Sequence, residues 1–281
     1  MFLGYLAETL QFYTLNCNGH LLSLAEPQVM GILNVTPDSF YAGSRQQTEE
    51  DIARRVEEIL TQGGSIIDVG ACSTRPDSQP VSEAEETERL RWALAIVRRE
   101  APQAIVSVDT FRPAVARMVV EEYGADIIND VGPSPLTSLT SQSSMFQMVA
   151  RLHVPYIYMS RKATMRDVLL DCAQVIDQLC SLGQKDIILD PGFGFGKNLE
   201  QNYEVLNGLE RMQMTGLPVL VGISRKSMIY RLLGCQPEQA LNGTTVLNTM
   251  ALLKGASILR VHDVREAMEC VKLFCKSLNI N

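Results

Sequence analysis

Short apolar runs alternate with segments of helical periodicity along most of this chain. From residue 29 onward the runs begin about 22 to 39 residues apart. They occupy residues 29–33, 65–69, 104–108, 126–128, 154–158, 186–189, 218–221 and 257–259. Runs this short, bounded by helix breakers, indicate strands buried on both faces. A helical segment after each strand predicts that the strands pair in parallel.

The repeating pattern predicts a single closed barrel. Eight strand–helix units follow one another without a Pro/Ser-rich linker. This favours an α/β fold, a (β/α)8 TIM barrel, over an open doubly wound sheet. Before the barrel, apolar-rich segments at 10–15 and 20–24 flank an Asn18-Gly19 turn, which predicts a β-hairpin that plugs one end. We expect a hairpin extension over residues 1–28 and the barrel over 29–281, as one domain.

Composition narrows the class of protein. Of the 281 residues, 46% are hydrophobic, yet no apolar run reaches the roughly 18 residues of a membrane span. The N-terminus shows no secretory signal, so we expect a soluble cytoplasmic protein without membrane partners. Seven scattered cysteines without a CxxC pair argue against a disulfide framework or a thiolate metal site. A net charge of -7 argues against nucleic-acid binding, although a local basic cluster could bind a small anion.

The stretch 187–197 indicates where a ligand binds. Its apolar run ends on Asp190, and Gly192, Gly194 and Gly196 follow, so the backbone can turn sharply and pass close to a ligand. Polar residues also end the other predicted strands, and in a barrel these ends meet on one face. They are Asn34, Asp68, Asp109, Asn129, Asp190, Ser224, Arg225, Lys226, Arg260 and His262.

Two kinds of chemistry are mixed at that face. Asp109, Asn129 and Asp190 suit a flat hydrogen-bonding heterocycle, because they are short acceptors and amides. Four donors suit phosphate instead. They are Arg75, Lys226, Arg260 and His262. The sequence therefore predicts a site that holds a polar ring at one end and an anion at the other.

From about residue 10 to the C-terminus the chain resembles the dihydropteroate synthase family, and seven blocks of sequence carry the resemblance in order and spacing. They are MGILNVTPDSF at 30–40, STRP at 73–76, SVDT at 107–110, INDV at 128–131, DPGFGFGK at 190–197, SRKS at 224–227 and RVHD at 260–263. The resemblance implies a pterin-binding TIM barrel that transfers a dihydropterinylmethyl group from its diphosphate ester to p-aminobenzoate. It also implies a homodimer, a magnesium requirement and a target of sulfonamides.

The resemblance also implies roles for single residues. Residues that contact the pterin are Asp109, Asn129, Met159, Asp190 and Lys226, and Gly222 is a further substrate-binding residue. Asn34, Arg260 and His262 match positions that bind the diphosphate, and Asn34 also matches a position that contacts Mg2+. Phe195, Lys226, Ser227 and Thr74 match positions at the p-aminobenzoate site. The residues implied in catalysis are Asp38, Arg75, Asp109, Lys226, Arg260 and His262.

Several residues have plainer interpretations. Asp68 is either a ligand contact or a buried structural carboxylate, and Asp130 is expected to be structural because it faces away from Asn129's side of the strand. Three basic pairs are interpreted as solvated faces. They are Arg54-Arg55, Arg98-Arg99 and Arg161-Lys162. The loop from Ser160 to Thr164 departs from the Met-His-Met pattern that is usual in the resembled family.

Alternative functions share part of the same constellation. A pterin-dependent methyltransferase would use the Asp109, Asn129 and Asp190 set, but has no use for a diphosphate site. A pterin-binding barrel without catalysis would not need to keep Asn34, Lys226 and Arg260. A Schiff-base lyase would need Lys226 in a desolvating apolar setting, which the neighbouring charged residues do not indicate.

Overall fold

Eight parallel strands form the centre of the molecule in the computed structural model, which describes residues 13–35, 49–72, 81–132 and 139–279. The strands are β3 (Gln28–Asn34), β4 (Ile66–Gly70), β5 (Ile105–Asp109), β6 (Ile127–Asp130), β7 (Tyr156–Met159), β8 (Ile187–Asp190), β9 (Leu220–Val221) and β10 (Ile258–Val261). Neighbouring strands pair in the order β8-β7-β6-β5-β4-β3-β10-β9. A parallel bridge between Leu189 and Val219 joins the two outer strands of this order. The predicted (β/α)8 barrel is therefore confirmed.

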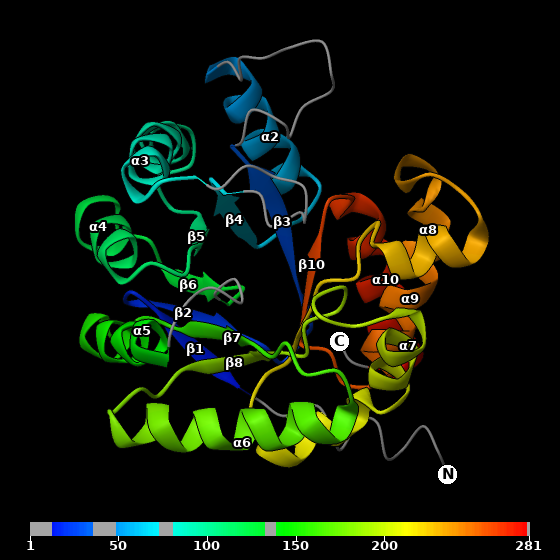
Figure 1. Cartoon of the computed structure of the whole chain (residues 1–281). Coiled ribbons are helices and arrows are strands. Elements are labelled where there is room, and N and C mark those ends of the chain that lie inside the picture. Colours follow the sequence, from blue (N-terminus) through cyan, green and yellow to red (C-terminus); the bar gives the residue numbers. More distant parts are fainter. Residues whose placement is uncertain (1–12, 36–48, 73–80, 133–138, 280–281) are drawn as a thin grey trace.

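Helices surround the strands (Figure 1). They are α2 (Glu49–Thr61), α3 (Glu83–Glu100), α4 (Pro113–Tyr123), α5 (Leu139–Leu152), α6 (Met165–Ser181), α7 (Leu199–Asn207), α8 (Ser227–Leu233), α9 (Leu241–Leu253) and α10 (Val264–Ser277), with 3-10 turns η1 (Leu209–Thr215) and η2 (Pro237–Gln239). Their limits follow local chemistry, since the Ser82 side chain accepts from the Glu85 N–H at the start of α3, and Pro113 opens α4. In the described ranges, none of the helices combines the length and apolar character that a membrane crossing requires.

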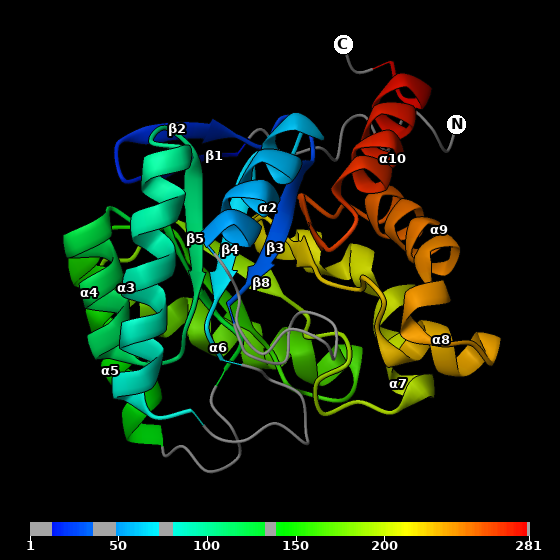
Figure 2. The same ribbon diagram turned by 90° about the horizontal axis from the view of Figure 1, so that it is seen from above.

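The predicted hairpin is present and covers the amino-terminal ends of the strands. Strand β1 (Thr14–Cys17) pairs antiparallel with β2 (His20–Ser23) around a turn in which Asn18 and Gly19 have φ of 50° and 94°. Leu15, Cys17, Leu22 and Leu24 pack with the first barrel layer in one buried cluster. Figure 2 shows the hairpin lying across one end of the barrel. The opposite, carboxyl-terminal end is left for the site.

The hairpin is expected to contribute to global stability. Leu15 is fully buried, so Leu15→Ala removes packing inside a closed cluster and is expected to lower the unfolding free energy by about 2–5 kcal/mol. Leu21, which is 76% exposed on the same hairpin, is the matched control. Leu21→Ala should change the unfolding free energy by less than about 0.5 kcal/mol. Urea unfolding followed by circular dichroism measures both. Equal stability of the two variants would show that the hairpin is not part of the cooperative core.

Candidate active site

A buried polar network lies on the floor of the barrel's carboxyl-terminal end, and Asp68 is at its centre. Its carboxylate is fully buried and accepts from Ser107 Oγ at 2.6 Å and from Arg260 Nε at 2.7 Å. Asn129 Nδ2 donates to both Asp68 oxygens, at 3.2 and 3.3 Å. Of the two interpretations of Asp68, a ligand contact or a structural carboxylate, these bonds favour the structural one. A lone carboxylate inside a fully buried strand was the available signal, because such a charge needs partners.

This network fixes the side chains that could meet a ligand. Asn129 Nδ2 faces Asp68, and its Oδ1 is buried without a hydrogen-bond partner among the described residues. A buried unpaired acceptor favours a ligand that brings an N–H group. Arg260 also reaches Asp109, with Nη2 3.3 Å from Oδ2. Burial raises the pKa of Asp109 to about 7, while the Arg260 guanidinium opposes this shift.

Asp190 ends β8 and is buried at the start of the glycine-rich loop. Its Oδ1 accepts from the Gly192 N–H at 2.7 Å. Burial raises the pKa of Asp190, and Lys226 is the largest opposing influence. A Cβ on Gly192 (φ 73°) would lie 2.1 Å from the Ser160 carbonyl oxygen, so only glycine fits there. The loop is thus held close to the strand ends.

Lys226 lies in a more desolvated setting than its sequence neighbours indicated. Its Nζ donates to the Phe193 carbonyl at 2.5 Å and lies 4.5 Å from the centroid of the Phe195 ring. Burial lowers the pKa of Lys226 to about 8, against the pull of Asp190. Charged groups nevertheless lie near it, as the sequence indicated, because Asp190 and Arg260 both act on its pKa. A Cβ on Gly222 would lie 3.8 Å from Lys226 Nζ, which places Gly222 on the floor beside it.

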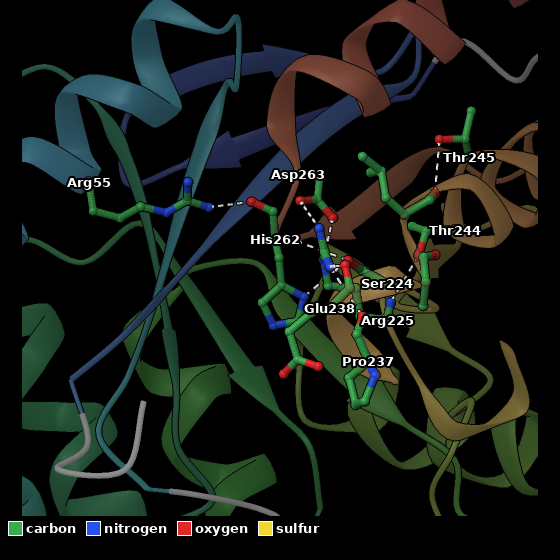
Figure 3. Close-up of polar contacts among 11 residues, drawn as sticks. Arg55, Ser224, Arg225, Pro237, Glu238, Thr244, Thr245, His262 and Asp263 are labelled. Atoms are coloured by element: carbon green, nitrogen blue, oxygen red, sulfur yellow. Dashed lines mark hydrogen bonds and ion pairs between the residues drawn. The ribbon is translucent and has the colours of Figure 1, made fainter. Parts of the chain in front are cut away.

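The loops after β9 and β10 are tied together beside this floor (Figure 3). Ser224 Oγ lies 3.0 Å from His262 Nδ1 and accepts from the His262 backbone N–H at 3.2 Å. Arg225, with φ of 53°, donates from Nε and Nη2 to the two Asp263 oxygens, each at 2.8 Å. Thr244 Oγ1 accepts from the Arg225 N–H. The backbone on either side of Lys226 and His262 is therefore anchored.

His262 follows β10 beside this floor. Although the residue is exposed overall, partial burial of the ring and then Arg260 lower its pKa to about 4. The Ser224 hydroxyl can donate to Nδ1, which leaves the ring proton on Nε2. His262 would therefore meet an anion with an N–H group, not with a positive charge.

Two of the basic residues assigned to solvated faces have structural contacts instead. Arg55 donates from Nη2 to the His262 carbonyl at 2.6 Å and from Nε to the Ile32 carbonyl. Arg98 pairs with buried Asp126 at 2.8 Å. Both predictions failed because the partners are distant in sequence. Asp130 takes the structural role that was expected, accepting from Tyr156 OH at 2.7 Å and from the Gly132 N–H.

Some of the remaining candidate site residues lie in the part of the chain that the structure describes, and others do not. Met159 is buried at the end of β7, Ser227 begins α8, and Phe195 is half-buried in the glycine-rich loop. Asn34 ends β3, and a Cβ on Gly70 would lie 3.3 Å from Asn34 Oδ1 and 3.8 Å from Asp109 Oδ2. The predictions for Asp38, Thr74 and Arg75 lie outside the described residues.

The donor set at Asn34 is compatible with magnesium. Asn34 offers an amide oxygen at a strand end, and oxygen is the ligand that Mg2+ prefers. Within the described part of the chain, no group of three His, Cys, Asp or Glu side chains could hold a metal ion. Mg2+ usually keeps several waters and shares substrate phosphates, so one protein oxygen fits its ordinary mode of binding.

Comparison with known proteins adds an independent line of evidence. The pterin binding enzyme family matches residues 30–262. A dihydropteroate synthase from Clostridium beijerinckii is 38% identical over 254 residues, covering 87% of this chain and 92% of that protein. A Xanthomonas albilineans dihydropteroate synthase structure with 4-aminobenzoic acid superposes with a TM-score of 0.85 at 34% identity, covering 96% of this chain and all of the other. A Coxiella burnetii dihydropteroate synthase in complex with pteroic acid gives a TM-score of 0.83 at 32% identity, covering 96% and 100% of the two chains.

Proposed function

This chain belongs to the dihydropteroate synthase family of pterin binding enzymes, and we propose that the residues at the carboxyl-terminal end of its barrel carry out that reaction. The enzyme transfers the 7,8-dihydropterin-6-ylmethyl group from its diphosphate ester to 4-aminobenzoate, giving 7,8-dihydropteroate and diphosphate. This chemistry needs a ring site, an anion site and an aminobenzoate site that meet at one carbon. The following assignments give each described residue its part.

The observation that carries the proposal is the set of acceptors on the barrel floor. Asp190 is buried with a carboxylate, the natural bidentate partner of the pterin's NH2–C–NH edge. Asn129 adds its unpaired buried oxygen, and Met159 provides an apolar surface at the end of β7. Lys226 donates to the ring or its substituents from the neighbouring loop after β9. Together these groups would orient the ring so that its methylene carbon faces outward.

Departure of diphosphate would be assisted by the donors at β10. Arg260 is held rigidly by Asp68 and Asp109, and preorganised donors stabilise developing charge without reorganising. His262 donates from Nε2. Asp109, whose carboxylate lies 3.3 Å from Arg260, would favour positive charge on the pterin carbon. The leaving group and the cationic carbon are thus stabilised by different residues of one network.

Mg2+ is part of the proposal, with Asn34 as its protein ligand. The metal's chemistry at this position is neutralisation of charge on the diphosphate oxygens. For 4-aminobenzoate, Phe195 and Lys226 would form the wall and Ser227, at the start of α8, would face the carboxylate. The seven free cysteines support a reducing compartment, so we place the enzyme in the cytoplasm. We also propose a homodimer through the outer helices near the C-terminus, where Leu273 and Val246 are 73% and 50% exposed.

The direct test measures turnover with both substrates and the metal. Purified protein is expected to form dihydropteroate and release diphosphate only when dihydropterin diphosphate, 4-aminobenzoate and Mg2+ are all present, as followed by mass spectrometry. Asn34→Ala should raise the Mg2+ concentration for half-maximal rate by about tenfold or more. Product that forms equally well after removal of all divalent cations would contradict the metal assignment. Pterin binding without product would instead contradict the assigned catalytic residues.

The pKa values of Asp109 and Lys226, on the floor of the barrel, predict a narrow pH profile for kcat/KM. Below its pKa of about 7, Asp109 is protonated and cannot favour a cationic carbon, so kcat/KM should rise with pH through that value. Above its pKa of about 8, Lys226 loses its charge, so kcat/KM should then fall. Because the two groups interact, the apparent values belong to the site as a whole. Lys226→Arg keeps its charge and should remove the alkaline fall. An unchanged alkaline limb in this variant would exclude Lys226 as its source.

A further inference from the structure

Arg161, in the unusual loop after β7, lies between the loops that follow β6 and β8. Its Nη2 is 3.3 Å from the carbonyl oxygens of Val131 and Gly132. Its Cζ lies 5.6 Å from the centroid of the Phe195 ring. The Nε atom is buried without a hydrogen-bond partner among the described residues. The guanidinium therefore stands half-buried on an aromatic face, although its sequence context indicated a solvated side chain.

The Phe195 backbone is bonded on both sides, since its carbonyl also accepts from Lys197 Nζ at 3.3 Å, whereas the ring contacts that the structure describes are with cations. Phe195 is flanked by Gly194 and Gly196, whose φ values of 78° and 64° are left-handed, so its backbone has no side-chain neighbours on either side. One backbone bond, from the Phe195 N–H to the Gly192 carbonyl, fixes the turn but not the ring. The ring contacts two cationic groups, Arg161 and Lys226. Cations over an aromatic face restrict its orientation.

The loop after β7 also supports the backbone beneath this ring. A Cβ on Gly196 would lie 2.9 Å from the Arg161 carbonyl oxygen, and a Cβ on Gly132 would lie 3.2 Å from Arg161 Nε. Arg161 thus fits into a space that two glycines leave open. Burial lowers its pKa, with Asp130 opposing, which agrees with a guanidinium withdrawn from solvent.

We propose that Arg161 is a positioning residue for the second substrate: it holds the Phe195 ring as one wall of the 4-aminobenzoate site. The inference rests on the proposed function, in which Phe195 lines that site. Arg161 does not touch the reacting atoms. It restricts the ring to the orientation that a flat aminobenzoate needs, so it should affect capture of this substrate and not of the pterin.

Kinetics of matched variants test this role. Arg161→Met removes the charge, and Arg161→Gln also removes it while keeping a donor for the Val131 and Gly132 carbonyls. Both are expected to raise KM for 4-aminobenzoate about three- to tenfold, with kcat and KM for dihydropterin diphosphate changed by less than about twofold. Arg161→Lys should restore most of the affinity. Lys162→Met is the control, because Lys162 is 57% exposed and lies 3.9 Å from its nearest carboxylate partner.

A double-mutant cycle separates positioning from a general structural effect. In a Phe195→Leu background, Arg161→Gln should add less than about 1.5-fold to KM for 4-aminobenzoate. A full additional increase there, or equal increases in both KM values, would overturn the proposal. Wild-type turnover is measured in the same assay, so its absence would contradict the proposed function itself. If Phe195→Leu alone leaves KM for 4-aminobenzoate unchanged, Phe195 is not in that site and the role of Arg161 falls with it.

Discussion

Arg260→Met is expected to reduce turnover by about 10²- to 10³-fold and to lower the unfolding free energy by about 3–5 kcal/mol. Both losses have one origin. The Arg260 side chain is 17% exposed and pairs with Asp68 at 2.7 Å and Asp109 at 3.3 Å. Its removal leaves the Asp68 and Asp109 carboxylates without the cation that lies between them. It also removes the preorganised donor that is proposed to face the leaving diphosphate.

A second buried ion pair separates the two effects. Arg98 pairs with Asp126 at 2.8 Å, and the two side chains are 21% and 4% exposed, close to the values for Arg260 and Asp68. This pair ties the end of α3 to the start of β6, away from the strand ends that carry the site. Arg98→Met is therefore expected to lose similar stability in urea unfolding while keeping turnover within about threefold. Equal loss of turnover in both variants would mean that destabilisation alone explains the Arg260 result.

Neutralising the Asp68 carboxylate, which pairs with Arg260, provides a further check of the Arg260 prediction. In the double variant Asp68→Asn with Arg260→Met, one of the unpaired carboxylates is neutral, so part of the lost stability should return. Turnover should not return, because the donor is still missing. Recovery of both quantities together would show that Arg260 acts only by neutralising Asp68.

The fold could be predicted from the sequence because the pattern of short apolar runs and helical segments is local and repeats along the chain. Each strand is a short buried run, and the structure differs mainly at the ends, where β3, β5 and β8 extend to include Asn34, Asp109 and Asp190. These polar residues end strands, so an apolar pattern stops one residue before them. Their convergence on one face followed from the barrel itself.

Which side chains pair with one another could not be predicted from the sequence, because these pairs join segments that are distant in the chain. Arg260 and Asp68 are separated by 192 residues, and Arg55 and His262 by 207. Nothing near Asp68 in the chain shows that three side chains converge on it. The same applies to Arg161, whose aromatic partner belongs to the next strand's loop. Residue type predicted what could bind, and tertiary packing decided which groups were held rigid.

Asp190→Asn is expected to weaken binding of dihydropterin diphosphate and to lower kcat/KM by about 10²- to 10³-fold. In the proposed site the Asp190 carboxylate accepts from two donors of the pterin edge, and charged hydrogen bonds contribute about 1.5–3 kcal/mol each. An amide at this position turns an N–H group toward the ring's own N–H groups, so a donor on each side is left unpaired. Calorimetric titration with dihydropterin diphosphate and steady-state kinetics measure the two effects.

Stability should respond in the opposite direction to binding. Folding raises the pKa of Asp190, mainly through burial, so above the unfolded pKa its ionised form destabilises the native state. Neutral asparagine removes that cost, and Asp190→Asn should melt at the same temperature as the wild type or higher. Asp130 is the matched control: it ends β6, is buried, and accepts from the Gly132 N–H at 2.8 Å as Asp190 accepts from Gly192 at 2.7 Å. Asp130→Asn should keep pterin affinity within about threefold. A similar loss of affinity in both variants would indicate that the two loops, and not the Asp190 carboxylate, determine pterin binding.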